Sequence, residues 1–556
     1  MSQVSASTLI DKGSPSNLDE QAAQQKDGAL LPESNQQQKA VSSSQWWVII
    51  GGLIGGFMAI LDIQIMNSSI KVIQGALSMS QDQSSWLMTS YFTAEIVAIP
   101  LVGWLTQAFG TGRYALYCIA GFIGASFLCA NAWNLDSMLL FRTIQGFCGG
   151  ALIPISFRLI IELLPDEKRP MGMTLFSVVS TFAPAIGPSL GGWLTSHFSW
   201  NMIFYINFLP GLVAAGLIYQ GMLFNKVRWE VLRAGDFVGI ISVMLFLGSL
   251  EVILEKGGTD YWFQSSLICY LSVVAAISFV VFIYDQLHCH YPLINLAMFK
   301  DMSFSYCMVV FIMMGTAIYG TLFLVPYYLS MVHDYSASQI GSVVIWMGLP
   351  QLLVLPFIPK LVKIINLKYM IVIGFGVLAL SAFMDSQMSM NFMGEQMTLS
   401  LFIRALGQPF IMVPLSLLAT KNVTRKDSAS SAIIINVFRS IGGSFGTAML
   451  TTFFITQVHI HSSNIQSSIA VGSQGYANFI SQVKTMVMHS AHVGNNGTVG
   501  QIASSILTER ITQQAEIMAF NDLFLIMGGL MLGTAVWVLL SNRDFRLFRH
   551  VTPIKG

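Results

Sequence analysis

The chain has 556 residues, of which 54% are hydrophobic and 10% are charged, and its formal net charge is +1. An ordinary soluble domain carries about 25% charged residues, so most of this chain is expected to lie in lipid. A net charge close to zero also argues against a nucleic-acid partner, which a basic surface would bind.

The first 45 residues differ in composition from the rest of the chain. Residues 1–45 are rich in Ser and Gln and lack apolar periodicity, so they are expected to form a disordered cytoplasmic tail. A cleaved signal peptide would have a basic start followed by an apolar core, and this segment does not show that arrangement. The first hydrophobic segment is therefore expected to serve as the insertion signal.

Fourteen apolar segments follow the tail. A helix needs about 20 apolar residues to cross a bilayer. The segments that meet this length are 46–68, 83–107, 113–132, 137–163, 171–196, 201–224, 236–255, 264–285, 303–330, 338–362, 368–387, 397–420, 429–457 and 520–541. The sequence therefore predicts an all-α membrane protein with fourteen transmembrane helices.

Lysine and arginine residues are distributed unevenly over the connections between these segments. If the N-terminus is cytoplasmic, the outer connections hold only Lys71, Lys256, Lys484 and Arg510. Cytoplasmic connections of membrane proteins carry an excess of basic residues. This pattern predicts a multi-pass protein of the inner (plasma) membrane with both termini cytoplasmic. It also predicts an extracytoplasmic loop at 458–519 and a cytoplasmic tail at 542–556.

The segment at 171–196 contains Gly187, Pro188, Gly191 and Gly192. Such a run would end a soluble helix, because proline lacks the N–H group and clashes with the preceding turn. In a membrane it is tolerated where neighbouring helices cover the backbone, and small residues let two helices pack closely. A tightly packed structural helix would explain the run. The amino-acid sequence of this run also resembles the antiporter signature in helix five of major-facilitator exporters.

Three further stretches carry a family resemblance. The first is a helix-one motif, which is similar to Leu61 and Asp62 with Asn67. The second is a helix-four motif, which is similar to residues 140–146. The third is the thirteenth helix of EmrB-like proteins, which is similar to residues 436–447. Over roughly 46–541 the chain resembles the EmrB/QacA-type drug:H+ antiporter family, the fourteen-helix branch of the major facilitator superfamily.

The resemblance implies the major facilitator fold. It implies an N-terminal six-helix bundle at 46–224, two inserted helices with connecting loops at 225–302, and a C-terminal six-helix bundle at 303–541. Sites in such folds lie between the halves, near the bilayer midplane. One departure is Gln107, which stands where the family's loop between helices two and three carries an acid. An inner-gate ion pair built on that acid is therefore not expected.

Three ionisable residues are candidates for proton coupling. A charge at the bilayer centre is costly, so Asp62 and Glu95 are functional candidates, and burial favours the protonated form of a carboxyl group. Arg142 matches an arginine that the resemblance ties to proton coupling, where it would modulate a neighbouring carboxylate. Glu251 is a weaker candidate because it belongs to the inserted pair. The alternative for each is a polar contact that only orients helices.

Three more arginines are candidates for the substrate cavity. Arg158, Arg404 and Arg439 lie within predicted membrane segments. Arg158 can reach the cytoplasmic interface with its long side chain, or it can face the cavity and attract a substrate that bears a carboxylate. The same two alternatives hold for Arg404 and Arg439. Arg439 lies in the helix-thirteen motif, so it is expected to face protein rather than lipid.

The sequence predicts no cofactor, no metal site and no enzyme activity. The phosphate-binding patterns GxGxxG and GxxxxGK[ST] are missing, so nothing indicates transport driven by ATP. The six cysteines show no CxxC spacing, and the adjacent residues of His288-Cys289-His290 point in different directions. No nucleophile with a matching base is evident.

These features predict a proton-driven secondary exporter of amphipathic compounds. Two alternatives stay open: a dedicated exporter of an anionic metabolite such as a siderophore, and a receptor or sensor that uses the transporter fold. The predicted partners are a small-molecule substrate, protons and the lipid bilayer. The resemblance further implies a periplasmic adaptor protein and an outer-membrane channel if the host is Gram-negative.

Overall fold

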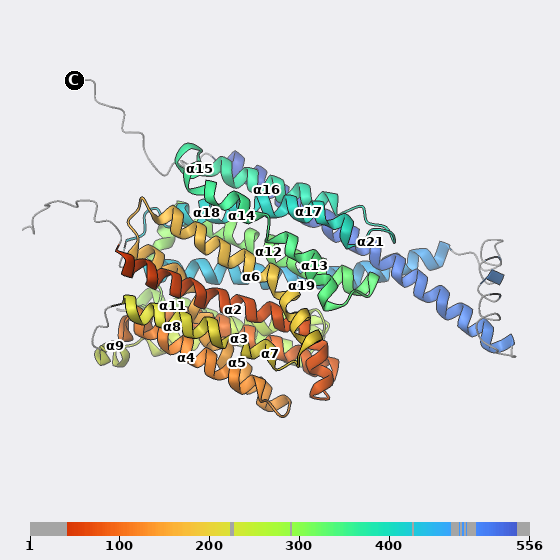
Figure 1. Ribbon diagram of the computed structural model, residues 1–556, viewed down its shortest axis with the longest axis horizontal. Helices are drawn as coiled ribbons and strands as arrows, with labels where there is room; N and C mark the ends of the chain where they lie inside the picture. Colours follow the sequence, from red (N-terminus) through yellow and green to blue (C-terminus); the bar gives the residue numbers. More distant parts are fainter. Residues whose placement is uncertain are drawn as a thin grey trace, which may run out of the picture. The chain divides into compact units, whose positions relative to one another are not determined.

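The computed structural model describes residues 42–222, 227–289, 292–424, 427–468, 478, 481–482, 485 and 496–541, the last range without side chains before 505. The described residues form helices and no strand. Fourteen helical segments are long and apolar enough to cross a membrane, which confirms the predicted fold class (Figure 1). The predicted tails at 1–45 and 542–556 lie almost wholly outside the described residues.

The first group of helices runs from residue 43 to residue 221. It consists of α2 (Ser43–Ala76), α3 (Gln81–Phe109), α4 (Thr111–Ala130), α5 (Leu135–Leu163), α6 (Arg169–His197), α7 (Met202–Tyr205) and α8 (Phe208–Gly221). Ser80 and Asn134 begin α3 and α5 with capping boxes, which satisfy backbone N–H groups that a helix start leaves free. The helices pack mainly on one another, with α2 against α6 and α8 and α3 against α5.

The second group of helices begins at residue 302. It consists of α12 (Met302–His333), α13 (Ala337–Val344), η3 (Ile345–Met347), α14 (Gln351–Val354), η4 (Leu355–Phe357), α15 (Ile358–Ile364), α16 (Leu367–Met384), α17 (Gly394–Gly407), α18 (Pro409–Ala419), α19 (Ser428–Ser468) and α21 (Asn496–Leu540). The span expected at 338–362 is broken into five short pieces, because Pro350, Pro356 and Pro359 each remove a backbone N–H from the helix.

The inserted elements lie between these groups in the sequence. They are α9 (Trp229–Arg233), α10 (Phe237–Gly257), η1 (Trp262–Gln264), α11 (Ser266–His288) and η2 (Leu296–Lys300). Helix α10 packs on α11, on α3 of the first group and on α19 of the second. Helix α11 exposes a row of large apolar side chains that includes Tyr270, Val273, Ile277 and Val280. It therefore faces lipid, while α10 faces the two bundles.

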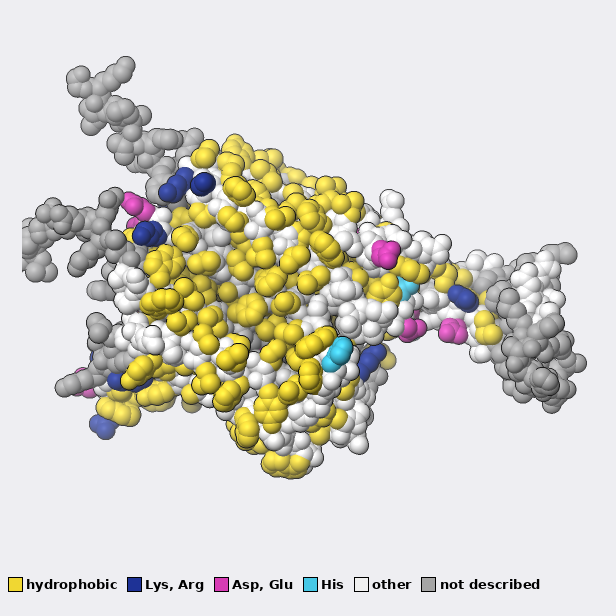
Figure 2. Space-filling model, viewed as in Figure 1, with side chains coloured by type: hydrophobic (Ala, Val, Ile, Leu, Met, Phe, Trp, Pro, Cys, Tyr) yellow, Lys and Arg dark blue, Asp and Glu magenta, His cyan; other side chains and the backbone are white. Residues whose placement is uncertain are grey.

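The bundle has two ends. The tail side is the end at which α2 begins, and the loop side is the end at which α2 finishes. Figure 2 shows hydrophobic side chains over the middle of the bundle and charged side chains towards its ends. This distribution fits a protein whose middle lies in hydrocarbon.

The helices α19 and α21 extend beyond the bundle on the loop side (Figure 1). They contain 41 and 45 residues, whereas about 20 residues cross a bilayer. The loop expected at 458–519 is thus helical at both of its ends, since α19 continues to Ser468 and α21 begins at Asn496. A hydrogen-bond contact of 2.8 Å between His461 Nε2 and Asp522 Oδ2 joins the two helices near the bundle.

Candidate functional site

Asp62 lies at the centre of a closed polar network in the first bundle. Its side chain is 2% exposed. Arg142 Nη1 of α5 donates to Asp62 Oδ2 at 2.6 Å, while Gln145 Nε2 and Asn207 Nδ2 donate to Oδ1 at 2.9 and 2.7 Å. Ser126 Oγ of α4 accepts from the same two amides. Both oxygens of Asp62 therefore have donors, as a buried carboxylate requires.

Arg142 is the cation of this network. It is fully buried at 0% exposed, and its Cζ atom lies 4.3 Å from the centre of the Tyr91 ring. Nη1 also donates to Gln145 Oε1 at 2.8 Å, whereas Nε and Nη2 have no hydrogen-bond partner. Asp62 is its ion-pair partner in the described part of the chain. The structure thus brings together two of the three residues predicted for proton coupling.

Glu95, the third of these residues, lies outside the network. It is half-buried on α3, and its backbone packs so closely on α5 that a Cβ at Gly150 would meet Glu95 Cα at 2.7 Å. Arg439 and Arg142 both act on its carboxylate electrostatically. Within the described residues the Glu95 side chain makes no hydrogen bond. Glu95 therefore differs from Asp62 in having oxygens free to exchange a proton.

Arg158 pairs with an acid on its own helix. Its Nε atom lies 2.6 Å from Glu162 Oε1, and Nη1 donates to Thr106 Oγ1 of α3. Glu162 also accepts from Ser428 Oγ of α19 at 3.4 Å. The group therefore joins the two bundles at the tail side. Its charge is neutralised there, so Arg158 is not placed to attract a substrate anion in this conformation.

Arg404 borders a small cavity between the bundles. The cavity is lined by Thr181, Ile318, Leu322, Met347, Leu378, Arg404 and Gln408. Arg404 is 3% exposed, and its Nη1 has no hydrogen-bond partner. Within the described chain it forms no ion pair. In this conformation the cavity is too small for an amphipathic compound, and Arg404 is a buried cation without a paired anion beside a closed, mostly apolar cavity.

Asp385 lies near Arg404 and was not predicted. It follows α16, and its Oδ1 accepts from Ser400 Oγ at 2.6 Å while Oδ2 has no partner. The Ser400 hydroxyl and the nearby Arg404 guanidinium are the groups that favour its charged form. No sequence motif marks this residue, although an acid beside an apolar segment could have been noted.

Arg439 of α19 contacts the first bundle. Nη2 donates to Asn436 Oδ1 at 3.0 Å, and Nη1 donates to Ser180 Oγ of α6 at 3.4 Å. Its Cζ lies 6.0 Å from the centre of the Phe176 ring, and Nε has no partner. Arg439 thus lies between the bundles, as expected of a residue that faces protein.

The glycines of α6 bring other helices very close. A Cβ at Gly187 would meet Gln64 of α2, and one at Gly191 would meet Ile65 O at 2.8 Å. Gly192 faces the second bundle, where a Cβ would lie 2.6 Å from Ser338 N. Pro188 is buried in the same helix. The run therefore packs α6 against its own bundle on one face and against α13 on another.

The bundles touch at both ends. On the loop side α6 packs on α13. Gly192 of α6 lies against the start of α13, and Gly341 of α13 lies against Ser189 of α6. On the tail side a Cβ at Gly103 would lie 3.0 Å from Ile433 Cδ1 of α19. Gln107 is the residue that stands where the family pattern has an acid, and its backbone oxygen accepts a hydrogen bond from Arg228 Nη2 at 2.7 Å. The conformation is closed at both ends around the small cavity.

Glu251 of α10, the weaker of the predicted carboxylate candidates, is buried. It is 3% exposed, and its Oε1 accepts from Ser444 Oγ of α19 at 2.8 Å. The sequence made it a weaker candidate than Asp62 and Glu95 because it belongs to the inserted pair. Gln145, Asn207 and Ser126 were also missed, although Gln145 belongs to the helix-four motif.

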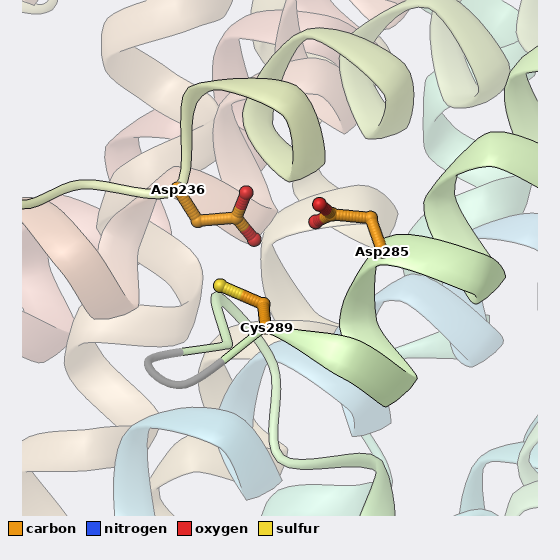
Figure 3. A group of neighbouring side chains, drawn as sticks. All are labelled: Asp236, Asp285 and Cys289. Carbon is orange, nitrogen blue, oxygen red and sulfur yellow. The ribbon is translucent and has the colours of Figure 1, made fainter.

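One cluster of potential metal ligands occurs in the described residues (Figure 3). The ligand atoms of Asp236, Asp285 and Cys289 lie within 4.8 Å of one another. Gln286 Nε2 donates to Asp236 Oδ2 at 2.5 Å and to Asp285 Oδ2 at 3.1 Å. An amide N–H group cannot ligate a metal, and here it occupies an oxygen of each carboxylate. The cluster therefore fits a set of hydrogen bonds that joins α10 and α11 better than a metal centre.

The comparisons with known proteins decide the family. The model for "Major Facilitator Superfamily" matches residues 52–447. This chain belongs to the major facilitator superfamily. It is 31% identical over 491 residues to the colistin resistance protein EmrB of Acinetobacter baumannii, covering 88% of this chain and 95% of that protein.

Other EmrB-type members of the superfamily are similar over most of the chain. The multidrug export protein EmrB of Escherichia coli K12 is 27% identical, with 86% of this chain and 91% of that protein covered. The fatty acid resistance protein FarB of Neisseria gonorrhoeae is also 27% identical, with 84% and 90% covered. These relatives place the chain in the EmrB-type branch of the superfamily.

A solved structure supports the superfamily's fold. The human organic anion transporter MFSD10 superposes with a TM-score of 0.56 at 11% identity, covering 88% of this chain and 99% of that chain. The protein is thus a multi-pass membrane transporter with two six-helix bundles and two inserted helices. It is a transporter of small molecules and not an enzyme.

Proposed function

We propose that the protein is a proton-driven exporter of amphipathic compounds. The buried pair of Asp62 and Arg142 carries this proposal, because its two charges have no other ion-pair partner in the described residues. A proton that neutralises Asp62 would release Arg142, so protonation and helix packing are linked in the first bundle. Glu95 lies on the neighbouring helix with a carboxylate that can deliver or accept that proton.

The names of the relatives support the direction and the kind of substrate. They describe colistin resistance, multidrug export and fatty acid resistance, and a fatty acid combines an apolar chain with a carboxylate. The cavity that Arg404 borders has the same mixed character. Binding of substrate there in alternation with protons would move the substrate out as protons move in.

Export of amphipathic anions is a second candidate. Arg404 Nη1 and Arg439 Nε are buried without hydrogen-bond partners, and both residues lie between the bundles. A carboxylate would satisfy such donors with charge-assisted hydrogen bonds. The anion could be a fatty acid or a dedicated metabolite such as a siderophore.

Transport into everted membrane vesicles tests both candidates. Vesicles that hold the protein are expected to take up ethidium, an amphipathic cation, or a medium-chain fatty acid when an acid-inside gradient is imposed. Uptake should stop when an uncoupler is added, because the gradient is the energy source. Uptake of the fatty acid alone would favour the anion candidate. Uptake that persists after the uncoupler would contradict proton coupling.

We further propose that the tail side faces the cytoplasm of the inner membrane. The arm formed by α19 and α21 would then project into the periplasm, where a periplasmic adaptor leading to an outer-membrane channel could bind it. The positive-inside distribution of Lys and Arg supports this orientation.

Cysteine labelling tests the orientation. In a background without the native cysteines, Ser463→Cys on the arm is expected to react with an impermeant thiol reagent added to intact cells or spheroplasts. Ser43→Cys at the start of α2 should react after the membrane is permeabilised, because it faces the other compartment. Labelling with the opposite pattern would reverse the orientation.

A further inference from the structure

The inserted helix α10 connects the two bundles at the loop side. Lys256 Nζ donates to Ser85 Oγ of α3 and lies 3.7 Å from Asp82 Oδ1. Five residues after α10, Trp262 Nε1 donates to Thr452 Oγ1 of α19 at 3.0 Å. The inserted helix is thus held by side chains of both bundles, and a movement of one bundle against the other must strain these contacts.

Glu251 lies on α10 where that helix meets α19. Oε1 accepts the hydrogen bond from Ser444, and Oε2 is buried without any hydrogen-bond partner. Glu251 forms no ion pair within the part of the chain that the structure describes. The charged groups that act on it are Glu255, one turn further along α10, and Glu95 of α3. Both are acidic, and neither can neutralise it.

A charged carboxylate is poorly stabilised in these surroundings. Among the described residues it receives one hydrogen bond, from the Ser444 hydroxyl, and a buried charge without a counter-charge is strongly unfavourable. The nearest base in the sequence, Lys256, binds Ser85 and lies over the Trp86 ring at 4.8 Å from its centre. A protonated carboxyl group fits the site, because it is neutral and still accepts from Ser444.

We propose that Glu251 binds a coupling proton, so that the inserted helix takes part in transport. Helix α10 packs more extensively on α3 than on α19, so α10 moves with the first bundle. When the bundles separate on the tail side, Ser444 leaves Glu251 and water from the cytoplasm reaches the carboxyl group, which then releases its proton to the cytoplasm. When they separate on the loop side, the carboxyl group takes up the next proton from the periplasm. This inference rests on the proposed proton-driven export and assigns a further carboxylate to it.

Infrared difference spectroscopy on the full-length protein in lipid nanodiscs tests the proton site without any substrate. The wild type is expected to show a carboxylic acid C=O band that is lost as the pH is raised. Glu251→Gln should lack that band, and Glu251→Asp should restore it at a shifted position. Glu255→Gln is the matched control on the same helix and should keep the band. Loss of the band in Glu255→Gln with its retention in Glu251→Gln would overturn the proposal.

Transport by the same variants tests the coupling role. In the everted-vesicle assay, Glu251→Gln is expected to lose the uptake of ethidium or the fatty acid that the proton gradient drives. Glu251→Asp is expected to recover part of this uptake with a changed pH profile. If wild type and Glu251→Gln are driven equally by the gradient with the same pH profile, this inference fails and the proposed function stands. If the wild type ignores the gradient, the proposed function fails and the coupling role of Glu251 fails with it, whatever the infrared band shows.

Discussion

Asp62→Asn is expected to abolish proton-driven export and to destabilise the protein. The substitution keeps the size of the side chain but removes the charge that Arg142 faces at 2.6 Å. Removing one partner of a buried ion pair costs about 3–5 kcal/mol, because the other charge stays buried and uncompensated. The variant should therefore unfold at a lower temperature in detergent and show no uptake driven by an acid-inside gradient.

The double variant Asp62→Asn/Arg142→Gln separates stability from coupling. It removes both charges, so most of the lost free energy of unfolding should return, since the desolvation of a buried pair offsets much of its attraction. Export should remain absent because the protonatable group is missing. If the double variant exports at the wild-type rate with unchanged pH dependence, the pair only stabilises the bundle. The proton site would then be sought at Glu95 and Glu251.

The sequence identified two residues of this network, but it did not show how they contact each other. Asp62 and Arg142 stood out because charges are rare in apolar segments. Their contact joins residues on different helices, and it depends on how those helices are rotated. Rotation could not be read from hydrophobic periodicity, because a helix between lipid and protein is apolar on all faces. For the same reason Gln145 and Asn207, which complete the network, were not found.

Glu251 of the inserted pair was a weaker candidate than Asp62 and Glu95 from the sequence. It was ranked lower because it belongs to the inserted pair. In the structure α10 packs on both α3 and α19, and α11 takes the lipid-facing position. The fourteen spans themselves were predicted well, since each requires about 20 apolar residues. The extension of α19 to Ser468 was missed because a polar helix outside the bilayer carries no hydropathy signal.

Gly192→Ala is expected to prevent the bundles from closing on the loop side and to reduce export strongly. The new Cβ would lie 2.6 Å from Ser338 N and 2.7 Å from Ala337 C. Both atoms are backbone atoms at the start of α13, so they cannot move aside as a flexible side chain could. The contact joins two bundles that must separate during transport. The fold of each bundle should therefore survive, while the conformation open on the loop side becomes more populated.

Two further glycines provide the controls for this prediction. At Gly191 an alanine would contact Ile65 O of the same bundle at 2.8 Å, so Gly191→Ala should lower stability, by about 1–3 kcal/mol for overpacking. Gly529 of α21 has nothing within 4 Å of its Cβ position, so Gly529→Ala should change neither stability nor export.

A cysteine at Ser189 reports on the closure directly. Its hydroxyl is buried beneath α13, so Ser189→Cys should react slowly with an impermeant maleimide in the Gly529→Ala background. In the Gly192→Ala background it should react faster, because the covering helix no longer closes over it. Unchanged reactivity together with normal export would show that α13 adjusts to the added methyl group. In that case Gly192 would serve helix packing alone, and the glycine run of α6 would have no part in opening and closing the loop side.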